Sequence, residues 1–164
     1  TEDPLARSAA DLRIRLEPVV EACAAAGMLV IQSVHPWYIP GNPVAVVERD
    51  TVWLPRGLTR GGEGAGPLVA AGTSAFYRTE LHQSLTARGI KCLVFAGLPT
   101  EVSVHSTMRD ANDRGFECLL LEDGTLGSSQ YEQDAIVRIT RFGNGLFGTT
   151  ATSSELLESM EMRR

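Results

Sequence analysis

Apolar strands and amphipathic helices alternate through the C-terminal two-thirds of the chain. The clearest unit is residues 93–124, LVFAGLPTEVSVHSTMRDANDRGFECLLLEDG, where an apolar strand, a turn, a helix and a second apolar strand follow in direct succession. No Asn-Gly or Asp-Gly pair joins two strands, so we expect right-handed crossovers and parallel strands. Several strands are unbroken apolar runs, which is typical of a sheet covered on both faces. The pattern predicts an α/β fold, a three-layer α/β/α sandwich with a mostly parallel, Rossmann-like sheet.

The spacing of apolar residues and the position of glycines predict the individual elements. The expected helices are 8–26, 79–88, 101–114, 129–142 and 153–162. The expected strands are 28–34, 93–96, 118–121 and 146–149. Residues 36–73 break the alternation, because they are rich in Pro and Gly and hold no long periodic segment. A loop of this length inside a domain is usually functional, or its written sequence is incomplete.

Length and charge limit the classes of function. The 164 residues fit one domain, 1–164, and the net charge of −5 comes from interleaved acids and bases. The chain has no Lys/Arg tract for nucleic acid and no apolar run of the roughly 20 residues that a membrane span needs. Its polar beginning is unlike a signal peptide, which favours a cytoplasmic protein. The three cysteines are too few for a disulfide framework, and we expect all of them to be core residues: Cys23, Cys92 and Cys118.

The turn after strand 93–96 is the best candidate for a functional site. Ligands of open parallel sheets bind outside the carboxyl ends of the strands. Thr100 is a good N-cap for the following helix, and Glu101 suits its positive end. Ser103 then falls in the first turn, where free N–H groups suit an anion or a developing oxyanion.

Two stretches carry a resemblance to a known family, the isochorismatase-like cysteine hydrolases. The family's Gly-x-x-Thr-Asp/Glu-x-Cys-Val stretch resembles residues 97–104, with Ser103 at the cysteine position. SAFYRTEL at 74–81 is similar to the family's Ser-Ala-Phe helix entry, and residues 109–115 look closest to the branch acting on biuret and ureidoacrylate. The resemblance implies hydrolysis of a C–N bond in a small amide or ureide, no cofactor, and a homo-oligomer, either dimer or tetramer.

The resemblance also implies the geometry of the site. The family tends to have a cis peptide before its conserved Thr, and an X-Pro bond is where the cis form costs least. We therefore expect a cis Leu98-Pro99 bond, with Leu98, Pro99 and Thr100 forming the oxyanion turn. The candidates for lining the substrate cleft are His35, Trp37, Tyr38 and Phe76. The aromatic members would stack on a planar ligand or, equally well, pack in the core or at a subunit interface.

The family's catalytic groups have no counterpart in this sequence. Its Asp comes from a strand before the first helix, and that strand is absent from the sequence given. Its Lys position holds Ala70 or Ala71, and the one lysine, Lys91, precedes a strand at the wrong end of the sheet. Nicotinamidase-type relatives bind metal through an Asp-x-His element, but residues 33–35 read Ser-Val-His, so we predict no metal site.

A serine at position 103 needs more help than a cysteine would. A helix terminus stabilises a nearby charge by at most about 2 kcal/mol, or about 1.5 pKa units, which activates a thiol but not an alcohol. His105 is only two residues along the helix and does not face Ser103. His35 and Asp123 both follow strands and are the candidates for a general base or its support. Two hypotheses stay open: an amide or ureide hydrolase with its nucleophile position occupied by serine, and a catalytically silent relative that binds a ligand or partner.

Overall fold

The computed structural model describes residues 4–34, 37–39, 42–45, 68–70 and 72–162. Its helices are α1 (Pro4–Ala25), α2 (Leu81–Ala87), α3 (His105–Asp113), α4 (Gln130–Thr140), α5 (Phe142–Gly145) and α6 (Ser153–Glu161), and a π-helical turn, η2 (Thr100–Val104), leads into α3. Its strands are β1 (Ser33–Val34), β2 (Trp37–Ile39), β3 (Asn42–Ala45), β4 (Leu68–Val69), β5 (Cys92–Gly97), β6 (Glu117–Thr125) and β7 (Thr149–Ala151).

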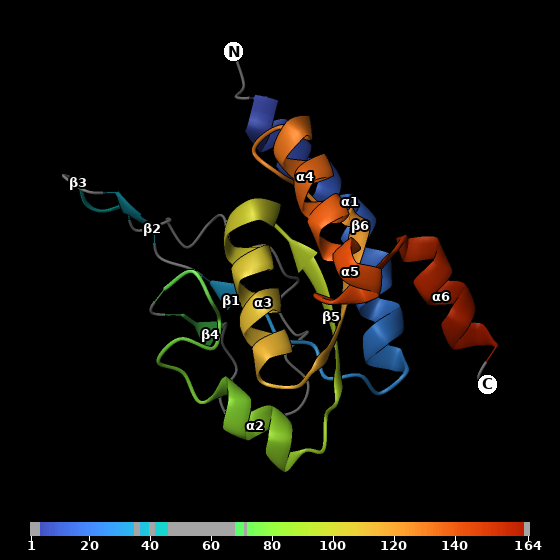
Figure 1. Ribbon diagram of the computed structural model, residues 1–164. Coiled ribbons are helices and arrows are strands. Elements are labelled where there is room, and N and C mark those ends of the chain that lie inside the picture. Colours follow the sequence, from blue (N-terminus) through green and yellow to red (C-terminus); the bar gives the residue numbers. More distant parts are fainter. Residues whose placement is uncertain (1–3, 35–36, 40–41, 46–67, 71, 163–164) are drawn as a thin grey trace.

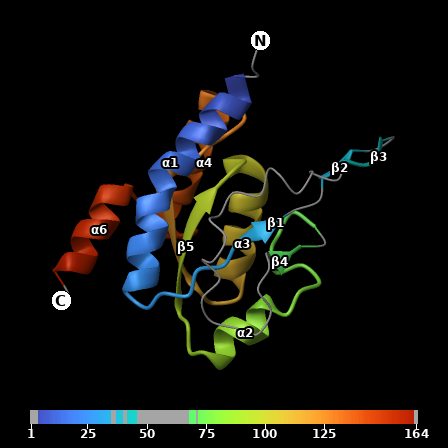
Figure 2. The same cartoon turned by 180° about the vertical axis from the view of Figure 1, so that it is seen from behind.

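The central sheet has the strand order β5-β6-β7, and all three strands are parallel. A second parallel pair joins β1 to β4, with Ser33 opposite Leu68. Figures 1 and 2 show α3 and α4 on one side of β5 and β6, and α1 and α6 on the other. The prediction of a three-layer α/β/α sandwich with a mostly parallel sheet is therefore confirmed.

Successive apolar side chains of β6 pack alternately into two core clusters, because neighbouring residues of a strand point to opposite faces of the sheet. Cys118 and Leu120 belong to the core cluster under α2 and α3, together with Met108 and Phe116. Leu121 belongs to the cluster under α1 and α6, with Leu119 packed against it. An unbroken apolar run is required here, since both faces of the strand are covered.

The predicted buried strand 28–34 is mostly wrong. Only Ser33 and Val34 are in a strand, and Met28 and Ile31 are 37% and 40% exposed. The run packs instead through Leu29 on one core cluster and Val30 on the other. An apolar run supplies side chains for burial, but a strand also needs a neighbouring strand to bond its backbone. In this run, pairing with the neighbour starts only at Gln32, whose carbonyl oxygen accepts the Leu68 N–H.

The expectation of no hairpin is also wrong. Strands β2 and β3 pair antiparallel, with Ile39 opposite Asn42. The residues between them in the sequence are Pro40 and Gly41, and Pro-Gly is a turn signal in its own right. The strand expected at 146–149 lies later, at Thr149–Ala151, because a short helix and a turn through Gly148 (φ 134°) precede it.

The cysteines divide into two groups. Cys23 and Cys118 are buried, as predicted, and burial raises the pKa of the Cys118 thiol to about 11. Cys92 is exposed at the start of β5, where its Sγ lies 3.4 Å from Glu117 Oε2, so its assignment to the core was wrong. The first residue of a strand lies at the rim of the sheet, beyond the cover of the helices.

No helix in the described part of the chain is both long and apolar enough to cross a membrane.

Candidate functional site

The turn between β5 and α3 is held by backbone hydrogen bonds to the end of β6. Gly97 adopts a φ of 120°, which favours glycine, and the Leu98-Pro99 bond is cis, as predicted. The Thr100 N–H donates to Leu126 O at 3.0 Å, and the Leu126 N–H donates to Gly97 O at 3.1 Å. These two hydrogen bonds to Leu126 fix the turn against the segment that follows β6.

Ser103 lies in η2 and is 6% exposed. Its Oγ is 3.5 Å from Leu98 O, a long and weak hydrogen bond. Within the described residues this carbonyl is the one partner of the Ser103 hydroxyl. A carbonyl oxygen accepts a hydrogen bond but does not take the proton, so this contact leaves the alcohol unactivated.

The predicted N-cap role of Thr100 is wrong. The N-cap position of the turn is held by Pro99, and no side chain makes a capping hydrogen bond there. The Thr100 hydroxyl instead donates to Gln133 Oε1 at 2.6 Å. Thr100 is fully buried, so its side chain is directed at α4 rather than at the helix end. Its N–H is also occupied by Leu126, so an oxyanion at this turn would need amides from the residues after Thr100.

The Ser-Ala-Phe stretch and the Ser103 segment meet in the fold. Thr107 donates through Oγ1 to Ser103 O at 2.7 Å and accepts the Ala75 N–H at 3.0 Å. One turn further along α3, Ser74 Oγ donates to Asp110 Oδ2 at 2.7 Å. The two sequence motifs are therefore parts of one structural unit.

Phe76 packs in the core rather than on the surface. It is 4% exposed, its ring stacks on Phe116 at a centroid distance of 5.9 Å, and the Arg114 guanidinium lies 5.1 Å from its ring. Of the two interpretations of Phe76, the structure favours core packing. Arg114 also forms an ion pair with Asp110, four residues earlier, at 2.6 Å.

Arg109 of α3 packs on an aromatic ring. Its guanidinium carbon lies 3.6 Å from the centroid of the Phe147 ring, which is a cation–π contact between α3 and the segment before β7. Since Phe147 is far along the chain, no local pattern could have indicated it.

Two of the other predicted cleft residues lie in a strand outside the central sheet. Trp37 and Tyr38 are in β2, and β2 pairs with β3 in a small sheet separate from the central one. His35 lies outside the described residues. Their contact with a substrate stays a prediction.

The described residues supply no base next to Ser103. Asp123 Oδ1 instead accepts the Ser153 N–H at 2.8 Å and its hydroxyl at 3.0 Å, at the beginning of α6. His105 is half-buried, and burial, with a smaller effect of Arg109, lowers the pKa of its imidazole. Its Nε2 is buried without a hydrogen-bond partner among the residues described.

The family's lysine has no substitute in the described structure. Ala70 is fully buried and Ala71 lies outside the described residues. Lys91 precedes β5, at the opposite end of that strand from Gly97. Across the described ranges, no group of three or more His, Cys, Asp or Glu side chains is placed to bind a metal ion.

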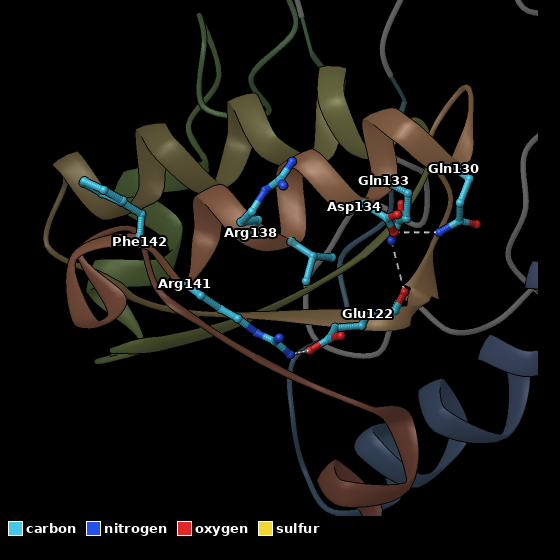
Figure 3. Close-up of a pocket in the computed structure, with 8 residues that line it drawn as sticks. Glu122, Gln130, Gln133, Asp134, Arg138, Arg141 and Phe142 are labelled. Atoms are coloured by element: carbon cyan, nitrogen blue, oxygen red, sulfur yellow. Dashed lines mark hydrogen bonds and ion pairs between the residues drawn. The ribbon is translucent and has the colours of Figure 1, made fainter.

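Sequence reasoning missed the role of Gln133. Its Nε2 donates to Glu122 O at 3.1 Å and to Thr125 Oγ1 at 3.0 Å, while its Oε1 accepts from Thr100. It also forms part of an open pocket of about 510 Å³ between α4 and β6 (Figure 3), whose lining residues are Glu122, Gln130, Gln133, Asp134, Val137, Arg138, Arg141 and Phe142. A glutamine in a polar helix gives no signal of its own, because its partners come from other elements.

Comparisons with known proteins agree with this arrangement. The isochorismatase domain matches residues 6–155. The ureidoacrylate amidohydrolase RutB of Methylorubrum extorquens is 39% identical over 93 residues, covering 56% of this chain and 37% of that protein. RutB of Klebsiella pneumoniae strain 342 is 30% identical over 157 residues, covering 79% of this chain and 66% of that protein. The chain spans only about a third of the length of the first curated relatives it matches, for example 33% of RutB from Variovorax paradoxus.

Solved structures show the same fold. A cysteine hydrolase from Pseudomonas syringae pv. phaseolicola 1448A superposes with a TM-score of 0.76 at 19% identity, covering 96% of this chain and 83% of the other. The nicotinamidase PncA of Bacillus subtilis gives 0.62 at 19% identity, covering 85% and 83%. With the family domain matched over residues 6–155 and both motifs joined at Thr107, the chain belongs to the isochorismatase domain family.

Proposed function

We propose that this chain is a hydrolase for a C–N bond of a small amide or ureide, with Ser103 at the position of the nucleophile. The observation that carries the proposal is the place of Ser103, buried in the first turn after β5 and joined through Thr107 to the Ser-Ala-Phe stretch. The similarity to ureidoacrylate amidohydrolases supports the bond class.

The proposed reaction has two stages. The side chain at position 103 attacks the carbonyl carbon, the C–N bond breaks, and the amine leaves with a proton, which forms an acyl-enzyme. Water then attacks the acyl carbon, releases the acid and restores the side chain. The first stage needs a deprotonated nucleophile, and a helix N-terminus supports a thiolate far better than an alkoxide. The unmodified chain is therefore expected to be strongly impaired and its Ser103→Cys form to be active.

Turnover by the Ser103→Cys form tests this proposal. Release of ammonia or amine is measured on a panel of ureides and linear amides that includes ureidoacrylate. The matched control is Ser106→Cys, since Ser106 lies on α3 three residues along and brings the same thiol to the same helix. We expect hydrolysis by Ser103→Cys at least tenfold faster than by the unmodified chain or Ser106→Cys.

A second candidate function is a catalytically silent protein that binds a small ligand or a partner. This second candidate is favoured by Ala70, which is buried in the region where the family has its lysine. A neutral methyl group cannot support a nucleophile as a charged amine would. If Ser103→Cys folds normally yet hydrolyses nothing in the panel, this candidate replaces the enzyme.

The same proposal includes a single domain over 1–164 that acts without a cofactor, as a cytoplasmic homo-dimer or tetramer. The family resemblance supports these features by analogy. Light scattering on the purified chain gives the oligomeric state, and a monomer would contradict this part of the proposal.

A further inference from the structure

Gln133 joins three segments that are distant in the sequence. It lies in α4, is half-buried, and uses its whole amide group: Oε1 accepts from Thr100, and Nε2 donates to Glu122 O and Thr125 Oγ1. Figure 3 shows its side chain extending from α4 towards Glu122, at the end of β6. One side chain thus connects α4, the carboxyl end of β6 and the beginning of η2.

Thr100 depends on this bond for its orientation. It is fully buried, and Gln133 is the hydrogen-bond partner of its hydroxyl. Its own N–H donates to Leu126 O, so the N–H and the hydroxyl of Thr100 both bind residues that follow β6. Ser103 is in the same π-helical turn, three residues later. A displacement of Thr100 would therefore move the amides of the turn and the side chain at position 103 together.

The backbone of Gln133 lies directly against the chain that follows β6. A Cβ at Gly127 would lie 2.9 Å from Gln133 N, so the chain after β6 passes directly against the first turn of α4. Thr125 is itself held, because its hydroxyl donates to Leu121 O at 3.0 Å. The amide of Gln133 is thus fixed at its backbone and at its partners.

We propose that Gln133 is a positioning residue, which holds the Thr100–Val104 turn and the side chain at position 103 in register with the end of β6. The inference rests on the proposed function, because the position of residue 103 matters only if that residue reacts. Gln133 does not touch the reacting atoms; it acts through Thr100.

The test measures the thiol of the Ser103→Cys chain without requiring turnover. Thiolate absorbance at 240 nm is titrated against pH, and subtraction of the same titration of the unmodified chain removes the signals of the other three cysteines and of the tyrosines. Gln133→Met is then added to both members of the pair. It keeps the approximate volume of the side chain and removes all three hydrogen bonds.

We expect Gln133→Met to lower the thiolate fraction of residue 103 at pH 7 roughly tenfold, since a displaced turn no longer holds the sulfur at the positive end of the helix. The matched control is Gln130→Met on the same helix, because Gln130 bonds Asp134 (2.7 Å) rather than the turn. Gln130→Met should leave the thiolate fraction unchanged. An unchanged fraction in Gln133→Met, or an equal change in Gln130→Met, overturns the proposal.

A second variant covers loss of folding. Thr100→Val removes the same hydrogen bond from its other end with little change in shape, and circular dichroism reports the fold. We expect Thr100→Val to lower the thiolate fraction as much as Gln133→Met does, and the double variant to lower it no further. Both changes break the same Thr100–Gln133 hydrogen bond. If the thiol of Ser103→Cys itself titrates like an ordinary cysteine and no substrate is hydrolysed, the proposed function fails as well. If that thiol is acidic and turnover occurs but Gln133 has no effect, only the positioning role fails.

Discussion

The hydroxyl of Thr107 lies between Ser103 and Ala75, donating to the Ser103 carbonyl oxygen at 2.7 Å and accepting the Ala75 N–H at 3.0 Å. Thr107 is 8% exposed, so water cannot readily replace either bond. The Thr100–Val104 turn and the Ser-Ala-Phe stretch are thereby held together, through a hydrogen bond between residues that are 32 positions apart in the sequence.

Replacement of Thr107 by Val should destabilise the protein by about 1–3 kcal/mol, because it leaves the buried Ala75 N–H without an acceptor. Urea denaturation measures the change in the free energy of unfolding. Thr107→Ser keeps the hydroxyl and should recover most of the loss, while Ser106→Ala on the neighbouring position should have little effect. An equal loss in Thr107→Ser would point to the methyl group rather than to the hydrogen bonds.

Gly148 should not accept a side chain. Its φ of 134° is unfavourable for any other residue, and a Cβ there would lie 2.5 Å from both Cys118 O and Met108 Cε. We expect Gly148→Ala to cost more than the roughly 1–2 kcal/mol of left-handed backbone strain, since β6 and α3 must also move. Gly145→Ala is the control, because Gly145 has a φ of 86° and open space around its Cβ position. Thermal unfolding of both variants separates the two effects: Gly145→Ala introduces backbone strain alone, and Gly148→Ala introduces backbone strain together with a steric clash.

The contact between Arg109 and Phe147 should contribute about 0.5–2 kcal/mol to stability. Arg109→Met keeps much of the aliphatic packing and removes the charge. The decrease in its free energy of unfolding, measured by chemical denaturation, therefore estimates the contribution of the cation–π contact. Asp113→Asn should be nearly neutral, because the structure assigns Arg109 to Phe147 and not to Asp113. A larger loss in Asp113→Asn than in Arg109→Met would show the assignment to be wrong.

His105 should make stability depend on pH. Burial and Arg109 lower the pKa of its imidazole in the folded state below the usual value of about 6.5. The unfolded chain then binds a proton more readily than the folded one. The free energy of unfolding therefore falls as pH decreases from about 6.5 towards the lowered pKa. Above about pH 6.5 this group has no effect on it.

The His105→Gln variant isolates this effect. Its free energy of unfolding should decrease less than that of the unmodified chain between pH 7 and about pH 5, before most carboxylates titrate. The other two histidines are common to both proteins and cancel in the difference. Parallel curves for the two proteins over this range would contradict the inferred burial of the neutral imidazole.

Much of the fold follows from local patterns. The run CLLLE predicts a strand covered on both faces, and Leu120 and Leu121 do lie in separate core clusters. The helices 8–26 and 153–162 agree with α1 and α6 within a few residues. These features depend on periodicity and on backbone preferences that each segment carries by itself.

Other features depend on partners that no local pattern contains. Thr100 has the residue type of an N-cap, but its hydroxyl is used by Gln133 on another helix. Cys92 has the residue type of the core, yet it lies at the exposed start of its strand. The run from Met28 is apolar enough for a strand, but most of it lacks the backbone neighbour that a strand requires.

The sequence by itself determined the alternation of helices and strands from α2 to α6, the family motifs and the placement of Ser103 in the first turn after a strand. The tertiary structure decided which groups reach that turn: the side chains of Thr107 from α3 and Gln133 from α4, and the backbone of Leu126 just after β6. The physical reason is that periodicity and turn preferences act over a few residues. A buried hydrogen bond instead forms wherever the packed elements leave a donor and an acceptor to satisfy each other.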